Sequence, residues 1–136
     1  MKIFWLMLAG ASGTLARYGI SLLIENWTLR PAEGVLPSPA FPLATLIINV
    51  LGSFLLAFIV TLALKGWVSP DLRLILGTGF LGAFTTFSTF ELEAAQLLES
   101  RLWPAATCTI AGNLLGGFIA ILLGRALALR VLTFVA

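Results

Sequence analysis

Long apolar segments are the feature that most constrains this chain. A helix needs about 20 apolar residues to cross the hydrocarbon core of a bilayer, and four such segments fit within the 136 residues, at about 2–24, 42–64, 71–99 and 103–124. Apolar residues make up 60% of the chain and charged residues only 10%, far from the proportions of a soluble domain. The sequence therefore predicts an all-α membrane protein, with one domain, 1–136, of four transmembrane helices.

Tryptophan and basic residues agree with this topology. Trp5, Trp27, Trp67 and Trp103 each fall at an end of a predicted span, where the membrane interface favours aromatic rings. The basic residues at or beyond the span ends are divided unequally between the two sides, with Lys2, Lys65, Arg73, Arg125 and Arg130 on the side of both termini and Arg30 and Arg101 opposite. Because basic residues favour the cytoplasmic side, this division favours an N-terminus inside the cell.

The third segment contains a stretch that disfavours a continuous helix. Between Gly79 and Phe90, glycines, β-branched residues and hydroxyls are crowded together, and these residue types lower helix propensity. Backbone that leaves the helix at membrane depth must be buried in protein or line a wet cavity, because lipid cannot satisfy its polar groups. We therefore predict that the third helix is broken at mid-membrane. Since such breaks occur at ion and substrate sites, we also predict that this break forms part of the functional site.

Small and polar residues share one face of the first segment. Gly10, Gly13 and Arg17 recur at helical spacing, which predicts close packing along that face. Arg17 either orients a polar site or an adjoining carboxylate, or it snorkels to the membrane interface. A signal peptide also has a charged start and a short apolar core, but here the apolar character continues to Ile24. The proline-rich residues 25–41 predict an exposed connection.

The second and fourth segments each carry a polar stripe. On the second, one face holds residues at helical spacing, namely Thr45, Asn49, Gly52 and Ser53. On the fourth, a polar pair one turn apart adjoins a pair of glycines, namely Thr109 with Asn113 and Gly112 with Gly116. A mid-span asparagine such as Asn49 serves either as a hydrogen-bonded link between helices or as a ligand group. Cys108 is predicted to be a small buried packing residue.

The residue content argues against an enzyme and in favour of transport. The chain has no histidine, no cluster of metal ligands, and no serine or cysteine with a recognisable base beside it. Its net charge of +2 is too small to suggest a nucleic-acid surface. A chain of 14.5 kDa encloses no roomy pathway, so we expect an oligomer in the lipid bilayer, most simply a symmetric dimer.

The polar groups at membrane depth suit a small anion. They are mostly neutral hydrogen-bond donors, namely Asn49, Ser88, Thr89, Thr109 and Asn113. Phe87 and Phe90 stand beside them, and the edge of a phenylalanine ring carries the positive part of its quadrupole. Ordinary packing is the alternative interpretation of these two rings.

Four motifs resemble one family of membrane proteins. The run from Gly79 to Phe90 (GFLGAFTTFSTF) closely resembles the third-span signature GFxGGxTTFSTF of the CrcB/Fluc fluoride channels. Residues 10–18 (GASGTLARY), 49–54 (NVLGSF) and 112–117 (GNLLGG) are similar to the first-, second- and fourth-span motifs. The resemblance covers about residues 8–125.

The resemblance implies a fluoride-selective channel in the cell (inner) membrane, through which fluoride leaves the cytoplasm passively. It implies a dimer of two oppositely inserted subunits with two pores. It further implies a structural sodium ion at the dimer centre, bound by main-chain carbonyls of Gly82 and Thr85. By the same resemblance, the family's pore residues fall on Asn49, Phe87 and Phe90, with hydroxyls from Ser88 and Thr89, and Glu93 matches a family glutamate beyond the break.

Two departures from the family pattern lie near the break. Ala83 stands where the family usually has glycine, which would stiffen the break. Glu91 stands where serine is common, and its carboxylate would slow anions near a pore end.

Other interpretations remain open at this point. A small dual-topology, proton-coupled drug exporter also has four spans, but it needs a carboxylate within the membrane, and the first span to Ile24 contains none. A purely structural partner subunit is a third interpretation. The unequal division of basic residues also leaves open a heterodimer with an oppositely oriented relative, because an evenly inserted homodimer should show little such bias.

Overall fold

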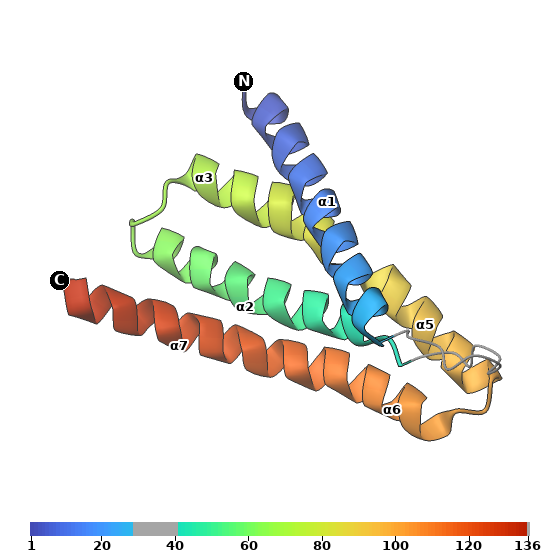
Figure 1. The fold of residues 1–136 in the computed structure, drawn as a ribbon. Helices are drawn as coiled ribbons and strands as arrows, with labels where there is room; N and C mark the ends of the chain where they lie inside the picture. The colour runs from blue at the N-terminus through green and yellow to red at the C-terminus, as the bar shows by residue number, and fades with distance from the viewer. Residues whose placement is uncertain (29–40, 136) are drawn as a thin grey trace.

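The computed structural model describes residues 1–28 and 41–135, and every regular element within these ranges is a helix (Figure 1). The helices form four long stretches, as predicted. Three of them are long and apolar enough to cross a membrane, at Lys2–Trp27, Leu43–Leu64 and Trp103–Phe134. The remaining stretch, near residues 70–99, is interrupted and therefore contains no single helix of that length.

The first two stretches are continuous helices. Helix α1 spans Lys2–Thr28 and helix α2 spans Leu43–Leu64. Helix α1 continues four residues past the predicted end of the first span, because Glu25 and Asn26 are polar without breaking a helix and the first proline comes only at position 31. The predicted connection thus begins later than expected, and its residues 29–40 lie outside the described part of the chain.

The third stretch begins with a capping serine followed by a proline. Helix α3 (Pro70–Leu74) starts after Ser69, whose hydroxyl accepts a hydrogen bond from the Leu72 amide at 3.2 Å. Proline fits the first turn because its missing N–H would have no partner there. The helix then widens into a π-helical segment, η1 (Ile75–Leu81), and ends in one α-helical turn, α4 (Gly82–Phe84).

The predicted break in this stretch is confirmed, and it is narrower than the glycine- and threonine-rich run suggested. Only Thr85 and Thr86 have extended backbones, with ψ of 159° and 116°. Helix α5 (Phe87–Glu99) follows directly. The glycines before the break remain helical because α1 packs closely on them, and a Cβ on Gly79 would lie 2.9 Å from that of Ala9.

The fourth stretch is continuous but contains a second π-helical segment, which the sequence did not predict. It consists of α6 (Trp103–Ala111), η2 (Gly112–Gly116) and α7 (Gly117–Val135). The helix runs beyond the predicted span end at 124 because no proline or glycine follows Gly124. The prediction that Cys108 is buried is wrong, since Cys108 is exposed in this chain. It lies between Ala106 and Thr109, the positions that face inward.

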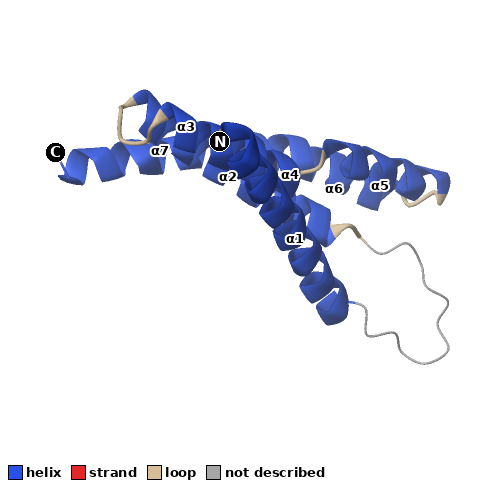
Figure 2. Cartoon of the chain, turned by 90° about the horizontal axis from the view of Figure 1, so that it is seen from above, coloured by secondary structure: helices blue, strands red, loops and turns tan. Residues whose placement is uncertain are grey.

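Helices α2 and α7 lie side by side, whereas α1 crosses the other helices at a steep angle (Figures 1 and 2). Between residues 103 and 134, every buried residue is small, namely Ala106, Thr109, Asn113, Gly117, Ala120, Gly124 and Ala128. Small residues let two helices approach closely. At Gly124 the approach reaches the backbone of α2, because a Cβ there would overlap the Phe54 carbonyl.

Helix α1 packs on η1 and α4 through its glycines, as their spacing predicted. A Cβ on Gly13 would overlap the Phe80 carbonyl, and one on Gly10 would contact the Gly79 carbonyl at 3.8 Å. At the start of α1, Lys2 Nζ lies 2.7 Å from Asp71 Oδ1. Both side chains are exposed, so this ion pair adds little stability. It does place the N-terminus and the 65–73 link at the same end of the molecule, as predicted.

Candidate functional site: a cavity beside the helix break

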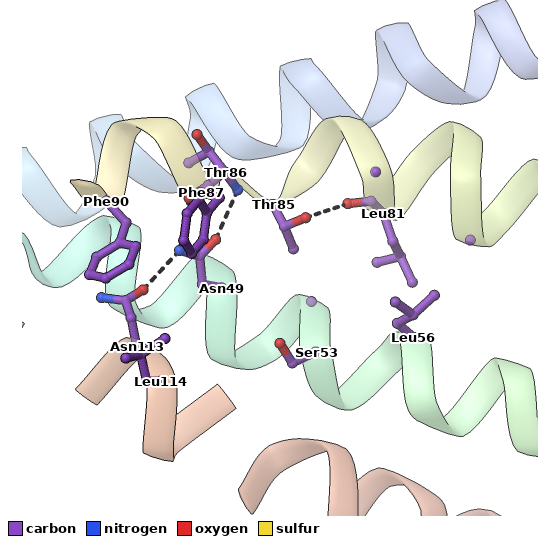
Figure 3. Close-up of a pocket in the computed structure, with 13 residues that line it drawn as sticks. Asn49, Ser53, Leu56, Leu81, Thr85, Thr86, Phe87, Phe90, Asn113 and Leu114 are labelled. Atoms are coloured by element: carbon purple, nitrogen blue, oxygen red, sulfur yellow. Dashed lines mark hydrogen bonds between the residues drawn. The ribbon is translucent and has the colours of Figure 1, made fainter. Parts of the chain in front are cut away.

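A cavity of about 270 Å³ lies next to the break in the third stretch (Figure 3). Three parts of the chain surround it: α2, the residues from Gly77 to Phe90, and the segment η2. Its polar groups are neutral amides and hydroxyls, contributed by Asn49, Ser53, Thr85, Thr86 and Asn113. Its apolar wall includes the rings of Phe87 and Phe90. No charged side chain lines the cavity among the residues that the structure describes.

Asn49 connects the three parts of the cavity wall. Its Oδ1 accepts a hydrogen bond from the Thr86 amide at 2.9 Å, and its Nδ2 donates to the Thr86 carbonyl at 3.0 Å. The same Nδ2 donates to Asn113 Oδ1 at 2.8 Å (Figure 3). Asn113, which is buried, donates in turn to the Thr109 carbonyl at 2.9 Å. The polar stripes of the second and fourth spans therefore meet at the break.

The break deprives the carbonyl oxygens of residues 82–85 of their helical partners, and at two of them side chains take the amides. In a continuous helix, the amide of residue i+4 donates to the carbonyl of residue i. The Thr86 amide donates to Asn49 instead of Gly82, as described above. The Thr89 amide donates to Thr86 Oγ1 at 3.3 Å instead of the Thr85 carbonyl. Side chains have thus taken the amides that would otherwise bind the Gly82 and Thr85 carbonyls.

The two phenylalanines form an edge-to-face pair at the cavity. Their ring centroids lie 5.4 Å apart and the rings are inclined by 70°. The two rings differ in burial, because Phe90 is 5% exposed and Phe87 is 64% exposed in this chain. Phe87 therefore forms an open side of the cavity, together with Leu114, which is 55% exposed.

The structure brings together only part of the predicted site. Ser88, Thr89 and Thr109 lie outside the cavity lining, although Thr89 accepts a hydrogen bond from Thr86 Oγ1 at 2.8 Å. Ser88 is exposed and Thr109 is buried. Arg17 is half-buried on α1 and forms no hydrogen bond or ion pair with another described residue. Its role thus stays a prediction.

Glu93 lies one helical turn beyond the cavity. Its Oε1 accepts a hydrogen bond from Thr45 Oγ1 at 2.8 Å, so the first polar residue of the α2 stripe pairs with α5. Its Oε2 is buried and has no hydrogen-bond partner among the described residues. Thr109 Oγ1 is the other buried side-chain oxygen in the described ranges that lacks a partner.

The sequence profile of the family described as "CrcB-like protein, Camphor Resistance (CrcB)" matches residues 4–125. The chain belongs to the CrcB family. It is 40% identical over 124 residues to a protein of Nitrosococcus oceani, covering 90% of this chain and 92% of the relative. It is 45% identical over 125 residues to one of Nitratidesulfovibrio vulgaris (90% and 93%) and 46% identical over 132 residues to one of Anaeromyxobacter sp. (93% and 98%). Each of these relatives is named a fluoride-specific ion channel.

Two polar cavity residues of this CrcB chain had no predicted role. Thr86 holds the break through its backbone and begins α5 with its hydroxyl, and Ser53 lines the cavity one turn from Asn49. The signal for Thr86 was its spacing, because a threonine three residues before Thr89 can cap a helix that starts between them. Ser53 was already noted on the polar face of the second span. With three apolar spans and a place in the CrcB family, the chain is a multi-pass membrane protein.

Proposed function

We propose that this protein is a fluoride-selective ion channel that lets fluoride leave the cytoplasm passively across the cell membrane. The observation that carries the proposal is the similarity over about nine-tenths of the chain to relatives named fluoride-specific ion channels. The cavity is compatible with this function, because its uncharged donors and ring edges attract an anion without binding it as tightly as a lysine would. The name of these relatives gives no support to an enzyme or to the drug exporter.

The small size of fluoride suggests how the site would select it. Fluoride holds its hydration shell more tightly than chloride does, so a selective site must replace that water with closely placed donors. Amide and hydroxyl groups around a narrow space offer such replacement, and the positive edges of the phenylalanine rings add to it. Chloride is larger and would not fit the same donor spacing.

A structural sodium ion would fit the break. Carbonyl oxygens are hard ligands that suit a hard cation, and the Gly82 and Thr85 carbonyls have lost the helical amides that would compete for them. Gly82 is also exposed in this chain. These two residues would hold the ion through their main chains, and a bound sodium ion would supply a fixed positive charge between two subunits.

A dimer of oppositely inserted chains would complete the cavity. Its wall includes Phe87 and Leu114, and most of the surface of each is exposed in this chain. A second protein surface against them would exclude lipid and water, as a pore requires. A second copy of this chain is the simplest partner, and an oppositely oriented relative would serve in the same way.

The test of the proposed function is ion efflux from liposomes that contain the purified protein. We expect rapid fluoride efflux and slow chloride efflux. Adding an organic cation should not change the pH inside the liposomes. Comparable rates for the two halides would contradict the proposal. Exchange of protons for an organic cation would support the exporter instead.

Replacing either ring of the phenylalanine pair should slow fluoride passage. Isoleucine in place of Phe87 or Phe90 keeps apolar bulk but removes the ring edge, so we expect fluoride efflux to fall by roughly two- to tenfold or more. Phe87→Ile should leave the fold of the single chain unchanged, because its ring is mostly exposed there. Leu114→Ile is the matched control, because it changes the shape of a side chain on the same open side of the cavity without removing a ring. Normal efflux in both phenylalanine variants would show that the rings only pack.

A further inference from the structure

The hydrogen bonds of Asn49 have a direction that the backbone fixes at both ends. The Thr86 N–H can only donate, so the Asn49 atom that faces it must be the oxygen Oδ1. At the other end, the Thr109 carbonyl can only accept, so the Asn113 atom that faces it must be Nδ2. Between these ends, Asn49 Nδ2 donates to Asn113 Oδ1 (Figure 3). The reverse orientation of either amide would place two donors or two acceptors against each other.

This arrangement uses both protons of the Asn49 amide. A primary amide has two N–H groups, and those of Asn49 are directed to the Thr86 carbonyl and to Asn113 Oδ1. The free lone pair on its oxygen would repel an anion. Asn113 differs, because one of its two N–H groups binds the Thr109 carbonyl and the other has no partner among the described residues. The Ser53 hydroxyl, also in the cavity wall, likewise forms no hydrogen bond with them.

Asn49 also decides which backbone groups at the break are free. Its Oδ1 occupies the Thr86 amide, which would donate to the Gly82 carbonyl in a continuous helix. Its Nδ2 donates to the Thr86 carbonyl, which as the N-cap carbonyl of α5 also accepts the first hydrogen bond of that helix. The amide side chain therefore takes the place of the one helical hydrogen bond lost by the Thr86 N–H, adds a bond to the Thr86 carbonyl, and leaves the Gly82 carbonyl available.

We propose that Asn49 is a positioning residue, which holds the helix break open through the backbone of Thr86 and does not donate to the permeating anion. The donors that meet the anion are then the second N–H of Asn113 and the hydroxyl of Ser53. This inference rests on the proposed fluoride conduction, and it adds the separate claim that the amide acts on the backbone.

Amide hydrogen exchange at Thr86, measured at single-residue resolution, tests the claim without reference to transport. Asn49→Ala removes the acceptor of the Thr86 N–H, so we expect its exchange to become about tenfold faster. Asn49→Asp keeps an oxygen in that place and should keep the protection. Asn113→Ala leaves Asn49 Oδ1 in place and should also keep it. Asn26→Ala, a change at the exposed asparagine of α1, is the matched control and should change nothing.

Fluoride efflux from liposomes with the same variants completes the test. We expect Asn49→Ala to lose most of the efflux together with the protection at Thr86. Asn49→Asp should conduct even less despite its protected amide, because it places an oxygen against the Thr86 carbonyl and Asn113 Oδ1 and adds a negative charge where an anion passes. Asn113→Ala should lose efflux with normal exchange at Thr86. These three results together would support a positioning role.

Two results would overturn it. If Asn49→Ala loses efflux while Thr86 exchanges as in the unmodified protein, the amide acts on the anion itself. If the Thr86 N–H exchanges faster in Asn49→Ala while fluoride efflux stays normal, conduction does not need the Asn49 side chain to hold the break. Failure of the proposed function is distinct from both, because the unmodified chain and Asn26→Ala would then conduct no fluoride, while the exchange data would still decide whether Asn49 holds the break.

Discussion

Thr86→Pro is expected to abolish fluoride efflux and to destabilise the fold by about 1–3 kcal/mol for each hydrogen bond that it removes. Thr86 has a φ of −149°, whereas proline fixes φ near −65°. Proline has no N–H, so the hydrogen bond from position 86 to Asn49 Oδ1 would be lost. It also has no hydroxyl to accept the hydrogen bond from the Thr89 amide. Efflux from liposomes and the midpoint of thermal unfolding in detergent measure the two effects.

The neighbouring threonine provides a control for this prediction. Thr85→Ser keeps the hydroxyl that donates to the Leu81 carbonyl at 2.9 Å and leaves the backbone unchanged, so its efflux and unfolding midpoint should stay close to those of the unmodified protein. The extended backbone of Thr85, with φ of −79° and ψ of 159°, is the conformation that a residue before proline prefers. The damage in Thr86→Pro therefore comes from position 86 itself. A Thr86→Pro variant with normal efflux would show that neither the angle nor the amide matters.

Gly13→Ala is expected to have the second largest effect, by separating α1 from the third stretch. A Cβ on Gly13 would overlap the carbonyl of Phe80. Backbone in η1 cannot rotate away as a side chain can, so the helices must move apart, at a cost of about 1–3 kcal/mol or more. We expect a lower midpoint of thermal unfolding and a loss of fluoride efflux, because η1 leads into the break.

Gly19→Ala is the matched control on the same helix. A Cβ on Gly19 meets nothing within 4 Å, and alanine favours a helix by about 1 kcal/mol over glycine. This variant should be as stable as the unmodified protein or slightly more so. Equal stability of the Gly13 and Gly19 variants would contradict the close contact between α1 and Phe80.

The helices could be predicted from sequence because length and hydropathy determine them. The starts of α3 and α6 also have local signals in the sequence, with Ser69 before Pro70 and Pro104 in the first turn of α6. The width of the break could not be predicted in the same way. Helix propensity predicted an interruption of the helix from Gly79 onward. Contacts with α1 keep the glycines helical, and only Thr85 and Thr86 leave the helix.

The candidate site was predictable as far as helical periodicity reaches. Spacing along one helix placed Asn49 on a face with Ser53, and Thr109 one turn from Asn113, and these relations hold in the structure. Pairing across helices was beyond that reasoning, since nothing in the spacing says that Asn49 meets the Thr86 backbone. The π-helical segment around Asn113 was missed for the same reason.

The exposure of Cys108 has a related cause. An apolar neighbourhood in sequence predicts burial in a soluble protein, but in a membrane protein apolar residues also face lipid. The exposure of Cys108 depends instead on its position on the helix, between the inward-facing Ala106 and Thr109.

The spacing of the buried small residues from Ala106 to Ala128 has a consequence for helix geometry. Their intervals of three, four and four residues occur twice in succession, which is an 11-residue repeat with about 3.67 residues per turn. The stripe passes through η2, where the π-helical turn holds more residues than an α-helical turn, so the four-residue intervals around Asn113 stay on the inward side of the helix. Inserting one residue between Asn113 and Gly124 would rotate the later half of the stripe away from α2 by about 100°. The side that this helix presents to its neighbours is thus encoded by where the alanines and glycines fall.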